Sequence, residues 1–215
     1  SMTPGMLGSV LNNNGVADAG KNAIANSTNA VRANNSIGYF TPNISGFTGQ
    51  VMVVLGENAG AAKTNNYTGF RASYGAGPIS AAYAWGKTKG ATGVADVTYT
   101  NFGASYDLGV AKPIFTWAQE KSGAGLKVTG MLFGATAPLG AGELRVAYSR
   151  YDVASSNNDW NKFAVGYVHN LSKRTALYTT YARVSNKGTS TTGVANNGLG
   201  GQAFGAATSL RASAG

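Results

Sequence analysis

Residues 166–178 read "GYVHNLSKRTALY", a pattern that predicts a strand, a tight turn and a second strand. Just before the turn, Phe163, Val165 and Tyr167 alternate with Lys162 and with small residues at 164 and 166. Alternation with a period of two is typical of a β-strand with one apolar and one polar face. A polar segment over 170–173 provides the predicted turn, the single histidine, His169, is placed in this hairpin turn, and a new run begins at Leu177.

The rest of the chain repeats this unit of a run of about ten residues, a connection and a run back. Long polar loops alternate with short turns, as in outer-membrane barrels. A turn is predicted from Pro138 to Gly142, and Pro113 is expected to break the run that contains it. The pattern predicts about eleven strands; the runs outside the hairpin are 36–41, 47–55, 67–74, 79–86, 98–107, 110–119, 126–136, 143–149 and 202–211.

The composition fits a membrane barrel but does not prove one. The chain has 215 residues, enough for one domain, and only 12% are charged against about 25% in soluble domains. Hydrophobic residues make up 43%, yet no apolar run approaches the roughly 18 residues that a membrane helix needs. A closed β-barrel is the only other structure that spans a bilayer. A soluble β-sandwich or solenoid fits the same numbers.

The net charge of +9 comes from 17 Lys and Arg against 8 Asp and Glu. These cations are scattered singly along the chain, whereas nucleic-acid-binding domains cluster them on one face, so we predict no nucleic-acid partner. The chain has no cysteine, which is compatible with an exported protein but excludes nothing.

No arrangement of residues indicates catalysis or metal binding. His169 has lysine and arginine as its nearest titratable neighbours, and the carboxylates lack the spacing of metal ligands. The glycine-rich stretch at 198–201 lacks the lysine of a phosphate-binding loop. We therefore expect no enzyme activity, no cofactor and no metal.

Three cations lie opposite apolar faces of their predicted strands, namely Arg71, Arg145 and Lys162. In a barrel this places them in the lumen, since a Lys or Arg at the lipid midplane costs about 2–4 kcal/mol. For each one taken alone, the favoured interpretation is an ordinary solvated wall charge. Together they predict a positive lumen that attracts anions.

Tyrosine and tryptophan concentrate near the ends of the predicted strands. In a barrel such residues form girdles at the membrane interfaces, although some fit cross-strand packing in a soluble sheet equally well. The girdle candidates, with one phenylalanine, are Tyr39, Phe40, Tyr67, Trp85, Tyr106, Trp117, Tyr148, Tyr151, Trp160, Tyr167, Tyr178 and Tyr181.

Three stretches resemble one family, the general diffusion porins of Gram-negative outer membranes, most of all the β-proteobacterial, anion-preferring type. The stretch "GYVHNLSKRTALY" resembles their next-to-last hairpin. "RANNSIGYFTPNISGF", from Arg32 to Phe47, resembles the strand after their pore-constricting loop, and "FGASYDLGVAK", from Phe102 to Lys112, resembles a later hairpin. The three occur in the order that the family has.

The resemblance implies an all-β fold, an antiparallel transmembrane β-barrel of sixteen strands in the family, of which about eleven are represented here. Residues 1–215 would form one barrel domain, with 1–31 as most of the constriction loop and 32–211 as barrel strands. By the same resemblance, Arg32 lies at the constriction and belongs to the basic cluster that sets anion preference. The implied function is passive diffusion of small anionic solutes by an outer-membrane homotrimer that contacts membrane lipid and lipopolysaccharide.

Two alternatives stay open at this point. The resemblance implies that the family's first five strands are absent from this chain, but a smaller barrel could also close by using part of the first thirty residues. The chain ends "TSLRASAG", without the terminal aromatic by which the family's assembly machinery recognises the last strand, and this argues against efficient insertion. The alternative function is a soluble or secreted β-rich binding or adhesin-like domain.

Overall fold

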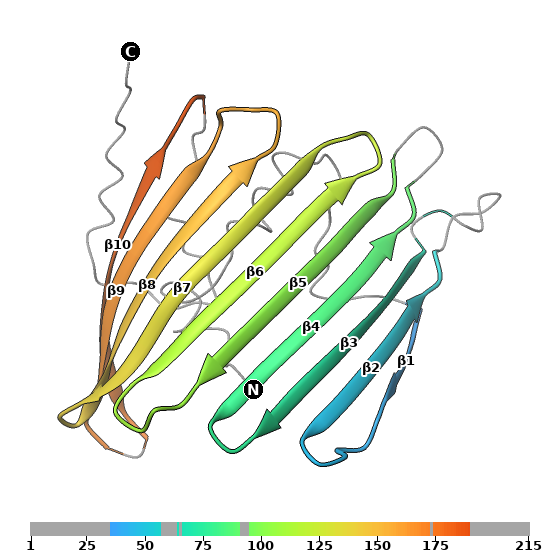
Figure 1. Cartoon of the computed structure of the whole chain (residues 1–215). Helices are drawn as coiled ribbons and strands as arrows, with labels where there is room; N and C mark the ends of the chain where they lie inside the picture. The colour runs from blue at the N-terminus through green and yellow to red at the C-terminus, as the bar shows by residue number, and fades with distance from the viewer. Residues whose placement is uncertain (1–34, 57–63, 65, 91–94, 173, 190–215) are drawn as a thin grey trace.

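The computed structural model describes residues 35–56, 64, 66–90, 95–172 and 174–189. They form one antiparallel sheet of ten strands in which every strand pairs with its neighbour in sequence (Figure 1). The strands are β1 Ser36–Phe40, β2 Phe47–Val54, β3 Tyr67–Ala76, β4 Ile79–Thr88, β5 Val97–Tyr106, β6 Lys112–Ser122, β7 Lys127–Leu139, β8 Gly142–Val153, β9 Trp160–Asn170 and β10 Ala176–Asn186.

Each described strand overlaps a run that the alternation predicts, and the all-β expectation is confirmed. The predicted run 202–211, the segment 1–31 and Arg32 lie outside the described residues. Pairing makes several strands longer than predicted, since the ladder continues as long as a neighbour supplies partners.

Two turn predictions are wrong in the same way. Pro138 lies inside β7 and pairs with Glu143, because the reversal needs only Gly140 and Ala141. Gly140 has a positive φ of 59°, which glycine adopts without steric cost. His169 lies inside β9, opposite Leu177, because the turn begins only at Leu171, whose amide donates to the Thr175 carbonyl at 2.9 Å.

The connections at one end of the sheet are longer on average than those at the other end. At one end they cover residues 55–66, 89–96, 123–126 and 154–159, and at the other 41–46, 77–78, 107–111, 140–141 and 171–175. We call these the loop end and the turn end. In outer-membrane barrels the longer loops face the outside and the short turns face the periplasm.

The register divides the side chains between two faces. The inner face carries buried small and aliphatic residues such as Leu132, Ala147 and Ala164, which pack together across β7, β8 and β9. The outer face carries large hydrophobic residues that stay accessible, such as Phe133 at 58% and Phe163 at 44%. A sheet that is apolar on its exposed face matches a wall that contacts lipid.

The girdle prediction is only partly right. Tyr39, Trp85, Tyr106, Trp117, Tyr148, Tyr167 and Tyr181 lie on the outer face, where a girdle must be. The register places the other five on the inner face; they are Phe40, Tyr67, Tyr151, Trp160 and Tyr178. Tyr151 and Trp160 stack there with ring centroids 5.0 Å apart, so they pack against each other instead of anchoring in the interface.

In the part of the chain that the structure describes, no helix is long and apolar enough to cross a bilayer.

Candidate functional site

The register brings the three predicted lumen cations that the structure describes onto the inner face. A directly opposed pair in an antiparallel ladder shares one face, so the partners identify the side on which each cation lies. Arg71 of β3 stands opposite Gln50 and Ala84, Arg145 of β8 opposite Thr136 and Gly166, and Lys162 of β9 opposite Ser149 and Val184.

The three cations do not form one cluster. Arg145 and Lys162 are on adjacent strands, offset by four residues along them, since Arg145 opposes Gly166 and Lys162 opposes Ser149. Arg71, on β3, lies five strands from Arg145, on β8, which is about 24 Å across the sheet at the usual strand spacing. Positive charge is therefore distributed around the wall instead of being concentrated at one point.

Arg145 is held by a neighbour on its own strand. Its Nε donates to Oε1 of Glu143 at 2.6 Å, and the Arg145 side chain is only 15% exposed. Residues two apart on a strand point to the same face, so this ion pair belongs to the inner face. The carboxylate offsets most of the field that the guanidinium would exert on a solute.

Arg71 is exposed and forms no ion pair with any residue that the structure describes. Its cross-strand neighbours Gln50 and Ala84 are uncharged. Of the three described candidates, Arg71 is the one in an exposed position.

Two further charges on the inner face were missed by the sequence reasoning. Lys112, the first residue of β6, lies in the same cross-strand row as Arg145, with Thr136 between them. Glu120 faces inward on the same strand and is buried, at 2% exposure. Their even numbering with Ile114 and Thr116 was the available signal. The expected break at Pro113 concealed Lys112, and Glu120 was missed because the predicted run ended at residue 119.

Within the strands, the inner face thus carries an excess of positive charge. Its cations are Arg71, Lys112, Arg145 and Lys162, and its carboxylates are Glu120 and Glu143. Among the described residues there is no group of three or more His, Cys, Asp and Glu side chains that could hold a metal. The face can attract an anion electrostatically.

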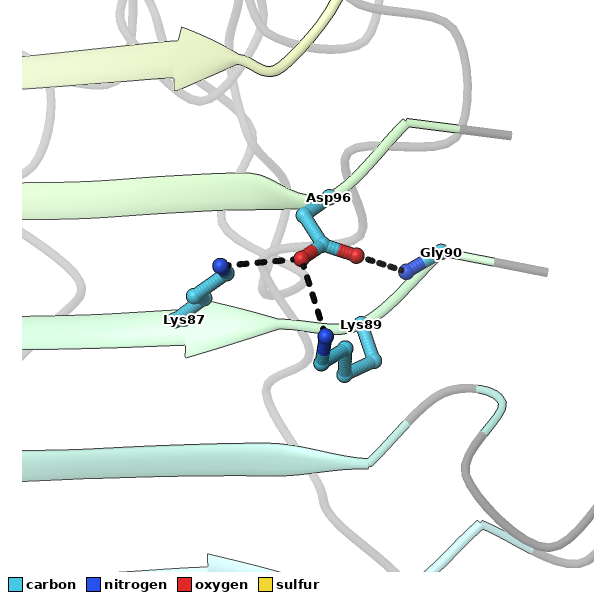
Figure 2. Close-up of polar contacts among 4 residues, drawn as sticks. All are labelled: Lys87, Lys89, Gly90 and Asp96. Carbon is cyan, nitrogen blue, oxygen red and sulfur yellow. Dashed lines mark hydrogen bonds and ion pairs between the residues drawn. The ribbon is translucent and has the colours of Figure 1, made fainter. Parts of the chain in front are cut away.

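A second charged group lies at the loop end, between β4 and β5 (Figure 2). Asp96 accepts from the ammonium groups of Lys87 at 2.9 Å and Lys89 at 3.4 Å, and from the Gly90 amide at 3.0 Å. The bond from Lys87, followed by that from Gly90, lowers the pKa of Asp96 from 3.8 to about 2. This carboxylate joins the two ends of the connecting loop.

We expect the Asp96 contacts to persist in acid. Because the folded-state pKa lies below the ordinary value, their contribution to stability is complete above about pH 4 and is lost as the pH falls through about 2. NMR titration of the Asp96 carboxyl carbon should give a midpoint near 2. Lys87→Gln should move that midpoint back toward 3.8, and a wild-type midpoint already near 3.8 would contradict the arrangement.

The fold, the outward apolar face and the inward charges define a section of an outer-membrane β-barrel wall. Residues 1–189 match the family model described as Gram-negative porin, and the chain belongs to this family. It is an outer-membrane protein.

The individual relatives that match this chain are also porins. The chain is 37% identical over 181 residues to outer membrane porin protein 32 of Delftia acidovorans, a match that covers 80% of this chain and 52% of that protein. It is similar in structure to the anion-selective porin from Comamonas acidovorans, with a TM-score of 0.64, 36% identity, and coverage of 73% of this chain and 50% of the other. The chain thus spans about half the length of these relatives.

A more distant neighbour shows the fold alone. It is a loop L8 deletion mutant of OmpT, an outer membrane protein of Vibrio cholerae, with a TM-score of 0.57 and 14% identity over 72% of this chain and 58% of that one. OmpT itself, in a trimer form, has a TM-score of 0.54 and 12% identity, with coverage of 70% and 54%.

Proposed function

We propose that this chain forms part of a water-filled pore through which small hydrophilic solutes diffuse passively, with a preference for anions. The observation that carries the proposal is the sidedness of the sheet. Cations exceed carboxylates on the inner face, and the outer face is apolar. Rings of Lys and Arg in a pore attract anions and repel cations without any bond being made or broken. The solved porin of Comamonas acidovorans is described as anion-selective, which supports the same assignment.

We further propose that residues 1–31 narrow the pore and that Arg32 lies at the narrowest point. Both suggestions rest on the resemblance of 32–47 to the strand after the constriction loop. Arg71 would act as an exposed wall cation, whereas Arg145 would act mainly through its pairing with Glu143. In this proposal residues 32–211 supply strands of a single barrel.

The lipid partners and the oligomeric state are proposals as well. The outer face would contact membrane lipid and lipopolysaccharide, and the complete pore would be a homotrimer, as OmpT is in one of its solved forms. Among the described strands, β1 and β10 each pair with one neighbour only. Because open sheet edges do not occur in lipid, both edges would pair with further strands in the membrane.

The alternative, a soluble or secreted binding domain, finds no support in the fold. Phe133, Phe163, Tyr148 and Tyr181 lie accessible on the same outer face, at 44% or more. A soluble sheet would bury such a face against another layer. The matched family and the relatives are porins.

Single-channel recording in a planar bilayer under a salt gradient tests the proposal. We expect the 215-residue chain to give stable conductance steps with a reversal potential that favours anions. Arg32→Ala should reduce that preference, since the variant removes one positive charge from the proposed constriction. Arg174→Ala removes an arginine from the turn-end connection 171–175 and serves as the matched control. A chain that stays soluble without detergent and gives no steps would refute the pore.

A further inference from the structure

The charged residues on the outer face all lie near the loop end. Within the described strands they are Lys87, Lys121, Lys127, Arg150, Asp152 and Arg183, and each is within three residues of the loop end of its strand. The middle and the turn end of this face carry no charged residue in these strands. Such a one-sided distribution is not required for solubility, because both ends of the wall meet water.

Two of these lysines face each other directly. Lys121 of β6 and Lys127 of β7 are register partners on the outer face, which places their Cβ atoms about 5 Å apart. Like charges directly opposite in a sheet are destabilising, and neither lysine forms an ion pair with a residue that the structure describes. The arrangement is therefore costly unless an external anion lies between the two.

The same row extends to a third lysine. Lys121 opposes Thr98, and Thr98 opposes Lys87, so Lys87 lies two strands from Lys121, about 10 Å away. Lys87 already forms an ion pair with Asp96, as Figure 2 shows. Asp152, the one carboxylate on this face of the described strands, pairs with Thr129 and forms no ion pair with a described residue. The row thus keeps unbalanced positive charge at Lys121 and Lys127.

The residues beneath the lysine pair indicate its depth in the membrane. Moving along the outer face from the lysines, the next rows contain Gln119 and Thr129, then Trp117 and Met131, then Phe115 and Phe133. Polar, amphipathic and fully apolar residues follow in that order, as they do from headgroup to hydrocarbon. Lys121 and Lys127 therefore lie at headgroup level on the loop side, which is the outer leaflet.

We propose that Lys121 and Lys127 bind a phosphate of the outer-leaflet glycolipid, the lipid A part of lipopolysaccharide. A phosphate offers several charged acceptor oxygens and can accept from both ammonium groups at once. This inference deepens the partner proposed above by assigning it a site, and it rests on membrane insertion but not on ion flow. Bound phosphate turns the repulsive pair into a bridge between β6 and β7.

Binding of purified lipid A to the detergent-folded 215-residue chain, followed by native mass spectrometry, tests the site. Each lysine near an anionic headgroup is worth roughly fivefold in affinity, so Lys121→Gln with Lys127→Gln should weaken binding of bisphosphorylated lipid A by about 25-fold. Lipid A stripped of its phosphates should bind wild type no better than it binds the double variant. The matched control Lys112→Gln removes a cation of β6 from the inner face and should bind like wild type.

A charge reversal separates binding from folding. Lys121→Glu creates an opposite-charge pair with Lys127, so it should raise the melting temperature in lipid-free detergent while abolishing the gain in melting temperature on adding lipid A. The proposal would be overturned if wild type, the Lys121→Gln/Lys127→Gln double variant and Lys121→Glu bound lipid A with equal affinity. It would also be overturned if wild type bound phosphate-free lipid A as tightly as bisphosphorylated lipid A. Because the readout needs no conductance, a chain that binds lipid A but forms no pore would refute the pore and leave this site standing.

Discussion

Phe133→Arg should lower the free energy of unfolding of this chain in lipid vesicles by about 2–4 kcal/mol, the cost of an arginine at the lipid midplane. Phe133 is the central residue of β7, lies on the outer face and is 58% exposed in the isolated sheet. Its ring packs against that of Phe115, with 4.9 Å between the centroids, and lipid would cover the exposed part. Urea titration of the vesicle-folded chain, monitored by tryptophan fluorescence, would measure the change.

A matched variant on the same strand controls for the arginine itself. Thr129 shares the outer face of β7 with Phe133 but lies four residues nearer the loop end. Thr129→Arg should cost only about 0–1 kcal/mol, because the penalty falls toward the interface. Equal penalties at the two positions would mean that depth in lipid does not decide the cost, and the assignment of the outer face would then be wrong.

Arg71→Gln should lower the anion-to-cation permeability ratio by up to about 30-fold, since one unit charge about 4 Å from a solute in water attracts an anion and repels a cation by about 1 kcal/mol each. Arg71 is exposed, its cross-strand neighbours are uncharged, and it forms no ion pair with any residue that the structure describes. The reversal potential under a salt gradient reports this ratio directly. An unchanged potential would show that Arg71 does not face the path of the solute.

The ion pair on β8 provides the control. Replacing both members, Glu143→Gln with Arg145→Gln, removes a nearly neutral pair and should leave the permeability ratio close to wild type. Glu143→Gln alone should raise the anion preference, because it frees the Arg145 guanidinium, which is 15% exposed in the pair. A decrease on Glu143→Gln would contradict the view that this carboxylate restrains the arginine.

The candidate site was only partly predictable. The alternation around Phe163 and Phe70 placed Lys162 and Arg71 on the correct face without any structure, because a strand has a side-chain period of two. Lys112 was missed, since Pro113 was expected to break the run 110–119. This prediction is wrong, because β6 starts at Lys112 and Pro113 is its second residue. The girdle prediction included too many residues, because closeness to a strand end does not tell on which face a side chain lies. Tyr151 and Trp160 are near strand ends, but the register places both on the inner face.

The sequence by itself determined the all-β class, the strands, the two faces and the family, since each depends on periodicity or on motifs that are local in the chain. The tertiary structure alone decided which residues of different strands meet. The distance from Arg71 to Arg145 follows from strand order, and the opposition of Lys121 and Lys127 follows from register. Local alternation excludes a shift of one residue, because such a shift moves every side chain to the other face, but it does not exclude a shift of two. Where each connection begins and ends decides among the registers that remain.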